Sequence, residues 1–253
     1  MSVFARFRAI DENQKSSVVK KLMEYSTPDF DYFYLVALSV LMASFGLMLD
    51  SGAIVIGSML IAPIMYPILG VSLGLVMSNY SVLGRSVSTL VKSLGGALLL
   101  SVLGAFFFGG PDMYYTAEVM MRTEPHILHL FVAIVAGAAV AYVLTQPEWS
   151  ETIPGVAISV ALIPPLATVG IGIAAVSPVI VKGAVLILLL NLAGIIGTAM
   201  VIFLLMNMAD QKKQKIAEST IKKEDIKQAD EQKAIAKMEV TLKKESDDEN
   251  NQS

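Results

Sequence analysis

Proline residues stand at matching places in two apolar segments, and they are the residues most able to create a binding site in this chain. Ser58 precedes Pro63 by five residues in the first segment, and Ser159 precedes Pro164 by five in the second. A proline inside a helix has no amide hydrogen and frees the carbonyl four residues earlier. In a membrane, freed carbonyls must find another partner or line a polar cavity. The two segments therefore predict a site for an ion or a polar solute, built from freed carbonyls and the positive N-terminal ends of half-helices.

The candidate substrate-binding residues are the small, hydroxylated and proline residues of these segments, together with one amide from the last apolar stretch. They are Gly57, Ser58, Ala62, Pro63, Pro67, Ser159, Pro164, Pro165 and Asn191. Packing is the alternative for the first eight, because small residues let helices approach closely and prolines are tolerated as kinks. For Asn191 the alternative is a hydrogen bond between helices, since an amide at membrane depth usually faces the protein interior.

No other group of residues in the sequence supports a different chemistry. His126 and His129 follow Glu124 at a spacing that would place both imidazoles on one helix face, but no further metal ligands accompany them. The chain has no cysteine, and no nucleophile with a base, no phosphate-binding loop and no pair of catalytic carboxylates can be assembled. We therefore expect no enzyme, no metal site and no cofactor.

The composition is that of a membrane protein. Of the 253 residues, 55% are hydrophobic and 16% are charged, whereas soluble domains carry roughly 25% charged residues. The formal net charge of -3 offers no basic surface for nucleic acid. The expected partner is therefore the lipid bilayer, and nucleic acid is not expected.

Six apolar stretches come close to the roughly 20 residues that a helix needs to cross the hydrocarbon. They cover residues 32–49, 52–77, 87–108, 127–144, 153–176 and 179–206. The second and fifth carry the matching prolines, so an odd number of crossings separates them and the second half would run antiparallel to the first. The sequence predicts an all-α integral membrane protein of two inverted three-helix repeats, about 32–108 and 127–206, with the second and fifth helices broken at the prolines.

Charged residues gather at the two ends of the chain and predict its orientation. Lysine and arginine concentrate on the cytoplasmic side of membrane proteins, and here they stand before the first stretch and directly after the last. We expect a cytoplasmic N-terminal segment over residues 1–31, a transmembrane domain over 32–208, and a charged cytoplasmic tail over 209–253 that is partly disordered. The loop from Asp112 to Glu124 would face outward from a plasma (inner) membrane.

The proline segments resemble a family of bacterial and archaeal hydrophobic-domain membrane proteins that is catalogued as a domain of unknown function. The resemblance is carried by Ser51–Pro67, by Pro154–Leu166 and by Asn191 with the leucine after it, and it spans about Tyr32 to Met206. Asp50 stands where such proteins often carry asparagine. The resemblance implies a membrane fold and no established activity.

The matching prolines favour a secondary transporter or a channel-like carrier of a small ion or polar solute, with a central site where the two broken helices meet. The lack of a carboxylate at membrane depth weakens a proton relay and slightly favours an anion or a neutral solute. The alternative is a non-transporting membrane scaffold or sensor, in which the breaks only shape the packing and the cytoplasmic tail binds a partner. Either protein could form a homo-oligomer.

Overall fold

The structure, a computed structural model, describes residues 12–25, 29–144 and 152–250, and within these residues every regular element is a helix. The elements are α2 (Glu12–Tyr25), α3 (Phe30–Met48), α4 (Gly52–Met59), α5 (Met65–Met77), α6 (Tyr80–Phe108), the 3₁₀ helix η1 (Pro111–Tyr115), α7 (Ala117–Met120), α8 (Ile127–Val143), α9 (Thr152–Ala174), α10 (Pro178–Leu205) and α11 (Gln211–Asn250). The predicted all-α class is confirmed for the described residues.

Three of these helices, α3, α6 and α10, are long and apolar enough to cross a membrane. At about 1.5 Å of rise per residue, the 29 residues of α6 and the 28 of α10 exceed the thickness of the hydrocarbon layer. Three shorter apolar helices, α5, α8 and the 161–174 part of α9, pack with them. The helices therefore have the composition and length of a membrane domain.

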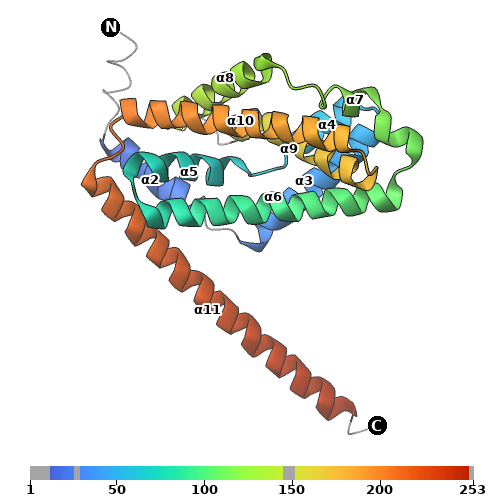
Figure 1. The fold of residues 1–253 in the computed structure, drawn as a ribbon. Helices are drawn as coiled ribbons and strands as arrows, with labels where there is room; N and C mark the ends of the chain where they lie inside the picture. Colours follow the sequence, from blue (N-terminus) through green and yellow to red (C-terminus); the bar gives the residue numbers. More distant parts are fainter. Residues whose placement is uncertain (1–11, 26–28, 145–151, 251–253) are drawn as a thin grey trace.

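The two longest helices of the bundle, α6 and α10, run in opposite directions on opposite sides of it (Figure 1). α6 packs on α3, α5 and α9, whereas α10 packs on α5, α8 and α9. The apolar core draws residues from both of these helices and from α2, α3, α5 and α9. α2 packs at one end of the bundle, between α5 and α11.

Four helices end in the same type of corner, which turns the chain sharply into the next element. The turning residues have left-handed backbones with φ between 49° and 55°, and they are Asp50, Ser78, Val176 and Asn207. At each corner the next amide donates to a carbonyl five residues earlier, as Asn79 donates to Gly74 and Ser177 to Gly172. This is the Schellman pattern of helix ends.

The corners at Gly74 and Gly172 lie 98 residues apart and also share their packing. A Cβ added at Gly74 would come within 2.8 Å of the Leu83 backbone, and one at Gly172 within 2.8 Å of the Ile180 side chain. Such distances leave no room for a side chain, so glycine allows the next helix to fold back closely in both halves. Gly46, at the corner between α3 and α4, is similarly confined, with the Val55 amide nitrogen at 2.9 Å, so the same tight turn occurs at three corners.

The two proline segments have different structures. Residues 60–64 lie outside any helix and separate α4 from α5, and Pro67 falls in the first turn of α5, where no amide donor is needed. α9, in contrast, continues through Pro164 and Pro165. The predicted break of the fifth apolar stretch at these prolines is therefore wrong, and the physical reason lies in a side chain of α10.

α11 leaves the end of the bundle and projects away from it as one long helix (Figure 1). Its first turns dock on α2 and α6. The Nζ of Lys213 is 3.1 Å from Glu12 Oε2 of α2 and donates at 3.0 Å to the Asn207 carbonyl at the corner after α10, and Asn79, which caps α6, donates to Glu218. The helix extends to Asn250, through most of the tail that we expected to be partly disordered.

Candidate functional site

A cavity of about 240 Å³ lies beside the two prolines of α9. Its walls come from the end of α4, the segment after α7, and helices α8, α9 and α10. Most of the lining is apolar, including Met59 and Ile187, but three polar side chains reach it: Arg122, His129 and Asn191. The cavity is therefore bounded by elements of both halves of the chain, and it opens to the surface beside Met121 and Val132.

Asn191 compensates for one of the two prolines inside α9. Pro165 has no amide hydrogen, so the carbonyl of Ala161 loses its helical donor. The Nδ2 of Asn191 donates to this carbonyl at 2.6 Å, and the side chain thereby replaces the missing backbone bond. Further along the helix, the Thr168 hydroxyl donates to the Pro164 carbonyl at 2.9 Å.

The other end of the Asn191 amide has no protein partner among the described residues. Only the nitrogen of an amide can donate to a carbonyl, so the bond to the Ala161 carbonyl identifies the bonded atom as Nδ2 and the other as Oδ1. Asn191 is 5% exposed, and its Oδ1 accepts no hydrogen bond. Buried polar atoms nearly always have a partner. The Oδ1 atom is therefore an unpaired acceptor, buried just beneath the surface of the cavity that the Asn191 side chain lines.

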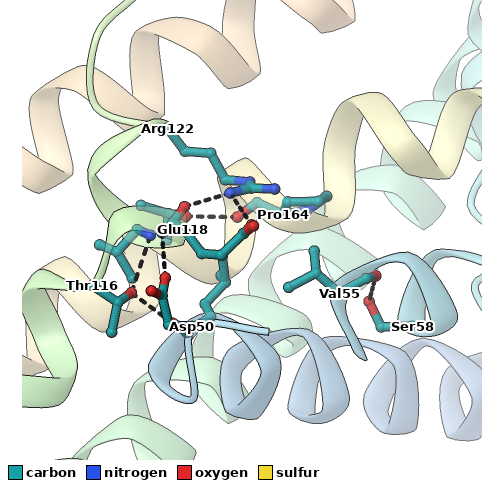
Figure 2. A network of polar contacts seen from close by, with 10 residues as sticks. Asp50, Val55, Ser58, Thr116, Glu118, Arg122 and Pro164 are labelled. Atoms are coloured by element: carbon teal, nitrogen blue, oxygen red, sulfur yellow. Dashed lines mark hydrogen bonds and ion pairs between the residues drawn. The ribbon is translucent and has the colours of Figure 1, made fainter. Parts of the chain in front are cut away.

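Arg122 is held at the opposite wall by the short helix α7. Its Nη1 donates to Glu118 Oε2 at 2.8 Å and also to the Glu118 carbonyl. The Glu118 amide in turn donates to Asp50 Oδ1 at 2.8 Å, which ties α7 to the corner between α3 and α4. Figure 2 shows the guanidinium group of Arg122 extending toward Pro164. The bonds to Glu118 leave Nε and Nη2 without an acceptor in the described part of the chain.

Over residues 59–197 the sequence matches the family described as Domain of unknown function (DUF389). The chain belongs to this family. It is also similar, with 30% identity over 166 residues, to an uncharacterised protein of Methanocaldococcus jannaschii, an alignment that covers 66% of this chain and 51% of the relative. The chain therefore spans about half the length of the curated relative that it matches. No solved structure matches.

Membership of the DUF389 family confirms the resemblance that the proline segments carry. The matched range begins at Met59 and ends after Asn191, so it includes every residue that lines the 240 Å³ cavity. It leaves out α2, α3 and α11. The family supplies no activity, and the chemistry of the cavity must be judged from its own residues.

Two candidates from the first segment serve packing in this member of the DUF389 family. Ser58 is fully buried, and its hydroxyl donates to the Val55 carbonyl at 2.6 Å (Figure 2), while its own carbonyl accepts from Ser39 at 2.7 Å. A Cβ added at Gly57 would come within 3.0 Å of Met42 Cε. Both residues therefore hold α4 against α3.

The remaining candidates of the first segment lie away from the 240 Å³ cavity. Ala62 and Pro67 are buried, and neither lines it. Pro63 lines a second, larger cavity of about 740 Å³, which is bounded by α2, α3 and α11. Its lining is rich in carboxylates and aromatic rings, with Tyr25 and Tyr66 stacked at a centroid distance of 4.5 Å.

The structure thus brings three of the predicted residues, Pro164, Pro165 and Asn191, to one cavity. Ser159 lies in the part of α9 whose side chains are outside the described residues. The predicted convergence of Pro63 with Pro164 in a single site is wrong, because the two prolines line different cavities.

Sequence reasoning missed two polar residues of the cavity, Arg122 and His129. His129 had been weighed as a metal ligand with His126, but the Nδ1 of His126 accepts from the Leu128 amide at 3.2 Å and caps α8. Among the described residues no group of three or more histidine and acidic side chains could hold a metal. The sequence offered one signal for Arg122, which is an ionisable residue close to an apolar stretch. Its position beside α9 at the cavity depends on the tertiary fold and does not follow from the sequence.

Proposed function

We propose that this protein is a membrane carrier of a small polar solute, and that the cavity at Asn191 is its central binding site. The observation that carries the proposal is the Asn191 Oδ1 atom, a buried acceptor without a protein partner in the described chain. Polar groups at membrane depth are costly and usually mark a substrate path. The side chain of Asn191 therefore has two roles: its nitrogen supports the proline helix and its oxygen contacts the solute.

The link between α4 and α5 supports a route through the protein. Met59, at one end of this link, lines the 240 Å³ cavity, whereas Pro63, four residues later, lines the 740 Å³ cavity. Residues 60–62 therefore separate two hollows, one on the side of α7 and α8 and the other beside α2 and α11. A short non-helical segment at this position is suited to opening one hollow at a time, as alternating access requires.

An architecture of six spans in two inverted repeats, about 32–108 and 127–206, is part of the proposal. It is supported by the equivalent corners at Gly74 and Gly172 and by the opposite directions of α6 and α10 (Figure 1). The packing partners also correspond, since α3 packs on α6 as α8 packs on α10, and α6 packs on α9 as α10 packs on α5. In this arrangement both termini face the cytoplasm from the inner membrane, because lysine and arginine flank the bundle at that end.

A transport assay tests the carrier directly. The purified protein in proteoliposomes should take up at least one solute from a panel of lactate, alanine, glycerol, choline, chloride and potassium. Ala161→Leu adds volume at the cavity wall and should abolish that uptake, whereas Ala161→Ser, which keeps the residue small, should retain it. Both variants are checked for expression and for a single peak in size exclusion. If wild-type protein moves none of these solutes, the carrier proposal is wrong.

A second candidate function is a membrane scaffold or sensor, and the projecting part of α11 favours it. Ile226, Ile235 and Met238 are more than half exposed on this helix, which extends beyond the bundle (Figure 1). Exposed apolar side chains on an isolated helix are typical of a surface that binds another chain. Deletion of residues 226–253 should leave uptake intact in a carrier, but it would remove the function of a scaffold.

A further inference from the structure

The polar groups that line the 240 Å³ cavity are of two chemical kinds. Asn191 presents an acceptor, whereas Arg122 presents donors and a positive charge, and His129 adds an imidazole. We propose that the solute bound here is a small monocarboxylate that also carries a hydrogen-bond donor, such as a hydroxy acid or an amino acid. The inference rests on the proposed function and names its substrate class.

Arg122 is suited to the carboxylate end of such a solute. A guanidinium group presents its N–H donors in a planar fork that matches a carboxylate. The bonds to the Glu118 carboxylate and carbonyl occupy Nη1, so Nε and Nη2 remain for a ligand. The side chain of Arg122 is 20% exposed, which leaves the pair partly shielded from water and strengthens its charge interactions.

Glu118 limits the ligand to one negative charge. Its carboxylate already neutralises the guanidinium of Arg122, with Oε2 at 2.8 Å from Nη1. A singly charged carboxylate can share the guanidinium with Glu118, but a second negative charge on the solute would face this carboxylate across a short distance. Dicarboxylates and phosphate esters are therefore disfavoured at this site.

Asn191 determines the other end of the solute. Its nitrogen is bound to the Ala161 carbonyl, so only the Oδ1 acceptor remains for a ligand. An acceptor of this kind needs a hydroxyl or ammonium hydrogen. A solute without a hydrogen-bond donor would leave the Asn191 oxygen buried and unpaired. A site with a buried acceptor therefore binds analogues that lack a donor more weakly.

The size of the cavity and its apolar walls complete the description. A volume of about 240 Å³ lies below the roughly 300–1,000 Å³ of drug-sized sites. Met59, Val132 and Ile187 line the space around the polar groups. The carbon skeleton of the solute is therefore short and contacts apolar side chains.

Thermal unfolding of the purified full chain in detergent tests this inference with defined probes. Lactate or alanine should raise the unfolding temperature. Propionate, which has the carboxylate and no donor, should bind at least tenfold more weakly, because one hydrogen bond in a buried site corresponds to about tenfold in affinity. Glycerol and choline, which have no carboxylate, should give no shift.

Two pairs of variants separate the carboxylate contacts from general loss of structure. Arg122→Gln should abolish the shift with lactate or alanine, whereas Glu118→Gln should keep it and should newly allow succinate to bind. His129→Gln should weaken binding, but the same change at His126, which does not line the cavity, should not. If Arg122→Gln does not fold, the Glu118 and histidine variants still decide the matter.

Several results would overturn the inference. Equal binding of propionate and lactate would contradict the role of the Asn191 acceptor. Stabilisation by choline or glycerol, lost in Ala161→Leu, would show a different substrate class and leave the carrier in place. If no probe shifts the unfolding temperature, this substrate class is also wrong. Uptake of chloride or potassium in proteoliposomes would in that case still support the carrier function.

Discussion

The side-chain nitrogen of Asn191 donates a 2.6 Å hydrogen bond to the carbonyl of Ala161, the carbonyl that Pro165 deprives of its helical donor. The two residues lie on different helices, α10 and α9, and 30 positions apart. Because this bond replaces a backbone bond, the state of α9 depends on a side chain of its neighbour. Any movement of α10 relative to α9 would expose the Ala161 carbonyl.

This relationship predicts a coupling between Asn191 and Pro165. Asn191→Leu should lower the free energy of unfolding by about 1 kcal/mol or more, because it leaves a buried carbonyl unpaired. In Pro165→Ala the backbone amide is restored, so the Asn191→Leu change should then cost clearly less. Denaturant unfolding of the four proteins of this double-mutant cycle measures the coupling. Additive effects would show that the bond does not support the helix.

The left-handed corner at Val176 gives a prediction about stability. A β-branched residue at φ 50° is strained, and Val176 is 85% exposed, so its side chain gains little from packing. Val176→Gly should therefore stabilise the protein by about 1 kcal/mol. Asp50→Gly, at the equivalent position of another corner, should gain less, since it removes the acceptor for the Glu118 amide. Thermal unfolding of both variants checks the difference.

The sequence predicted the helices and the importance of the prolines, but it could not predict what each proline does. Pro63 lies in the non-helical segment before α5, which begins at Met65. Its missing amide hydrogen therefore removes no helical hydrogen bond. Pro165 is tolerated inside α9 because a distant amide, Asn191, replaces its bond. The pattern of two matching prolines is local, whereas the pairing with Asn191 depends on how α10 packs. For the same reason the sequence placed Asn191 among the candidate site residues without revealing its bond to the Ala161 carbonyl.

The other polar residues of the 240 Å³ cavity were also not predictable from the sequence, because tertiary contacts place them there. Arg122 follows a four-residue helix, α7, whose position is fixed by the Thr116 hydroxyl donating to Leu47 at 2.7 Å and by Asp50 accepting from Glu118. Neither contact follows from periodicity or spacing, because each joins segments nearly seventy residues apart. Polar residues outside the apolar stretches can thus reach a site within the bundle.

The docking of α11 predicts which part of the tail matters for stability. Ala217 and Ile221 are buried, and Asn79 donates to Glu218 at 2.8 Å. Deletion of residues 211–253 should therefore lower the unfolding temperature in detergent, whereas deletion of residues 234–253 should leave it nearly unchanged. Equal stability of the two truncated proteins would show that α11 does not contribute to the folded bundle.

The contacts of Glu12 predict a pH dependence at the end of the bundle. Hydrogen bonds from Lys15 and then from Lys213 hold the pKa of Glu12 below its usual range. A lowered pKa in the folded state stabilises the protein above the unfolded pKa, and this contribution is lost as the pH falls through the folded value. Glu12→Gln should therefore be less stable than wild type at pH 7, and the difference should shrink below about pH 4.5. A difference that grows on acidification would contradict this assignment.

The proposed orientation predicts which surfaces are accessible from outside the cell. The chain has no cysteine, so a single introduced thiol reports one position. Asp112 and Ser219 are both exposed in the structure, and they lie on η1 and α11. If lysine and arginine hold both ends of the bundle in the cytoplasm, Asp112→Cys should react with an impermeant maleimide in intact cells and Ser219→Cys only after lysis. Reaction of Ser219→Cys in intact cells would reverse the topology, and the 740 Å³ cavity, which α11 helps to line, would then open to the outside.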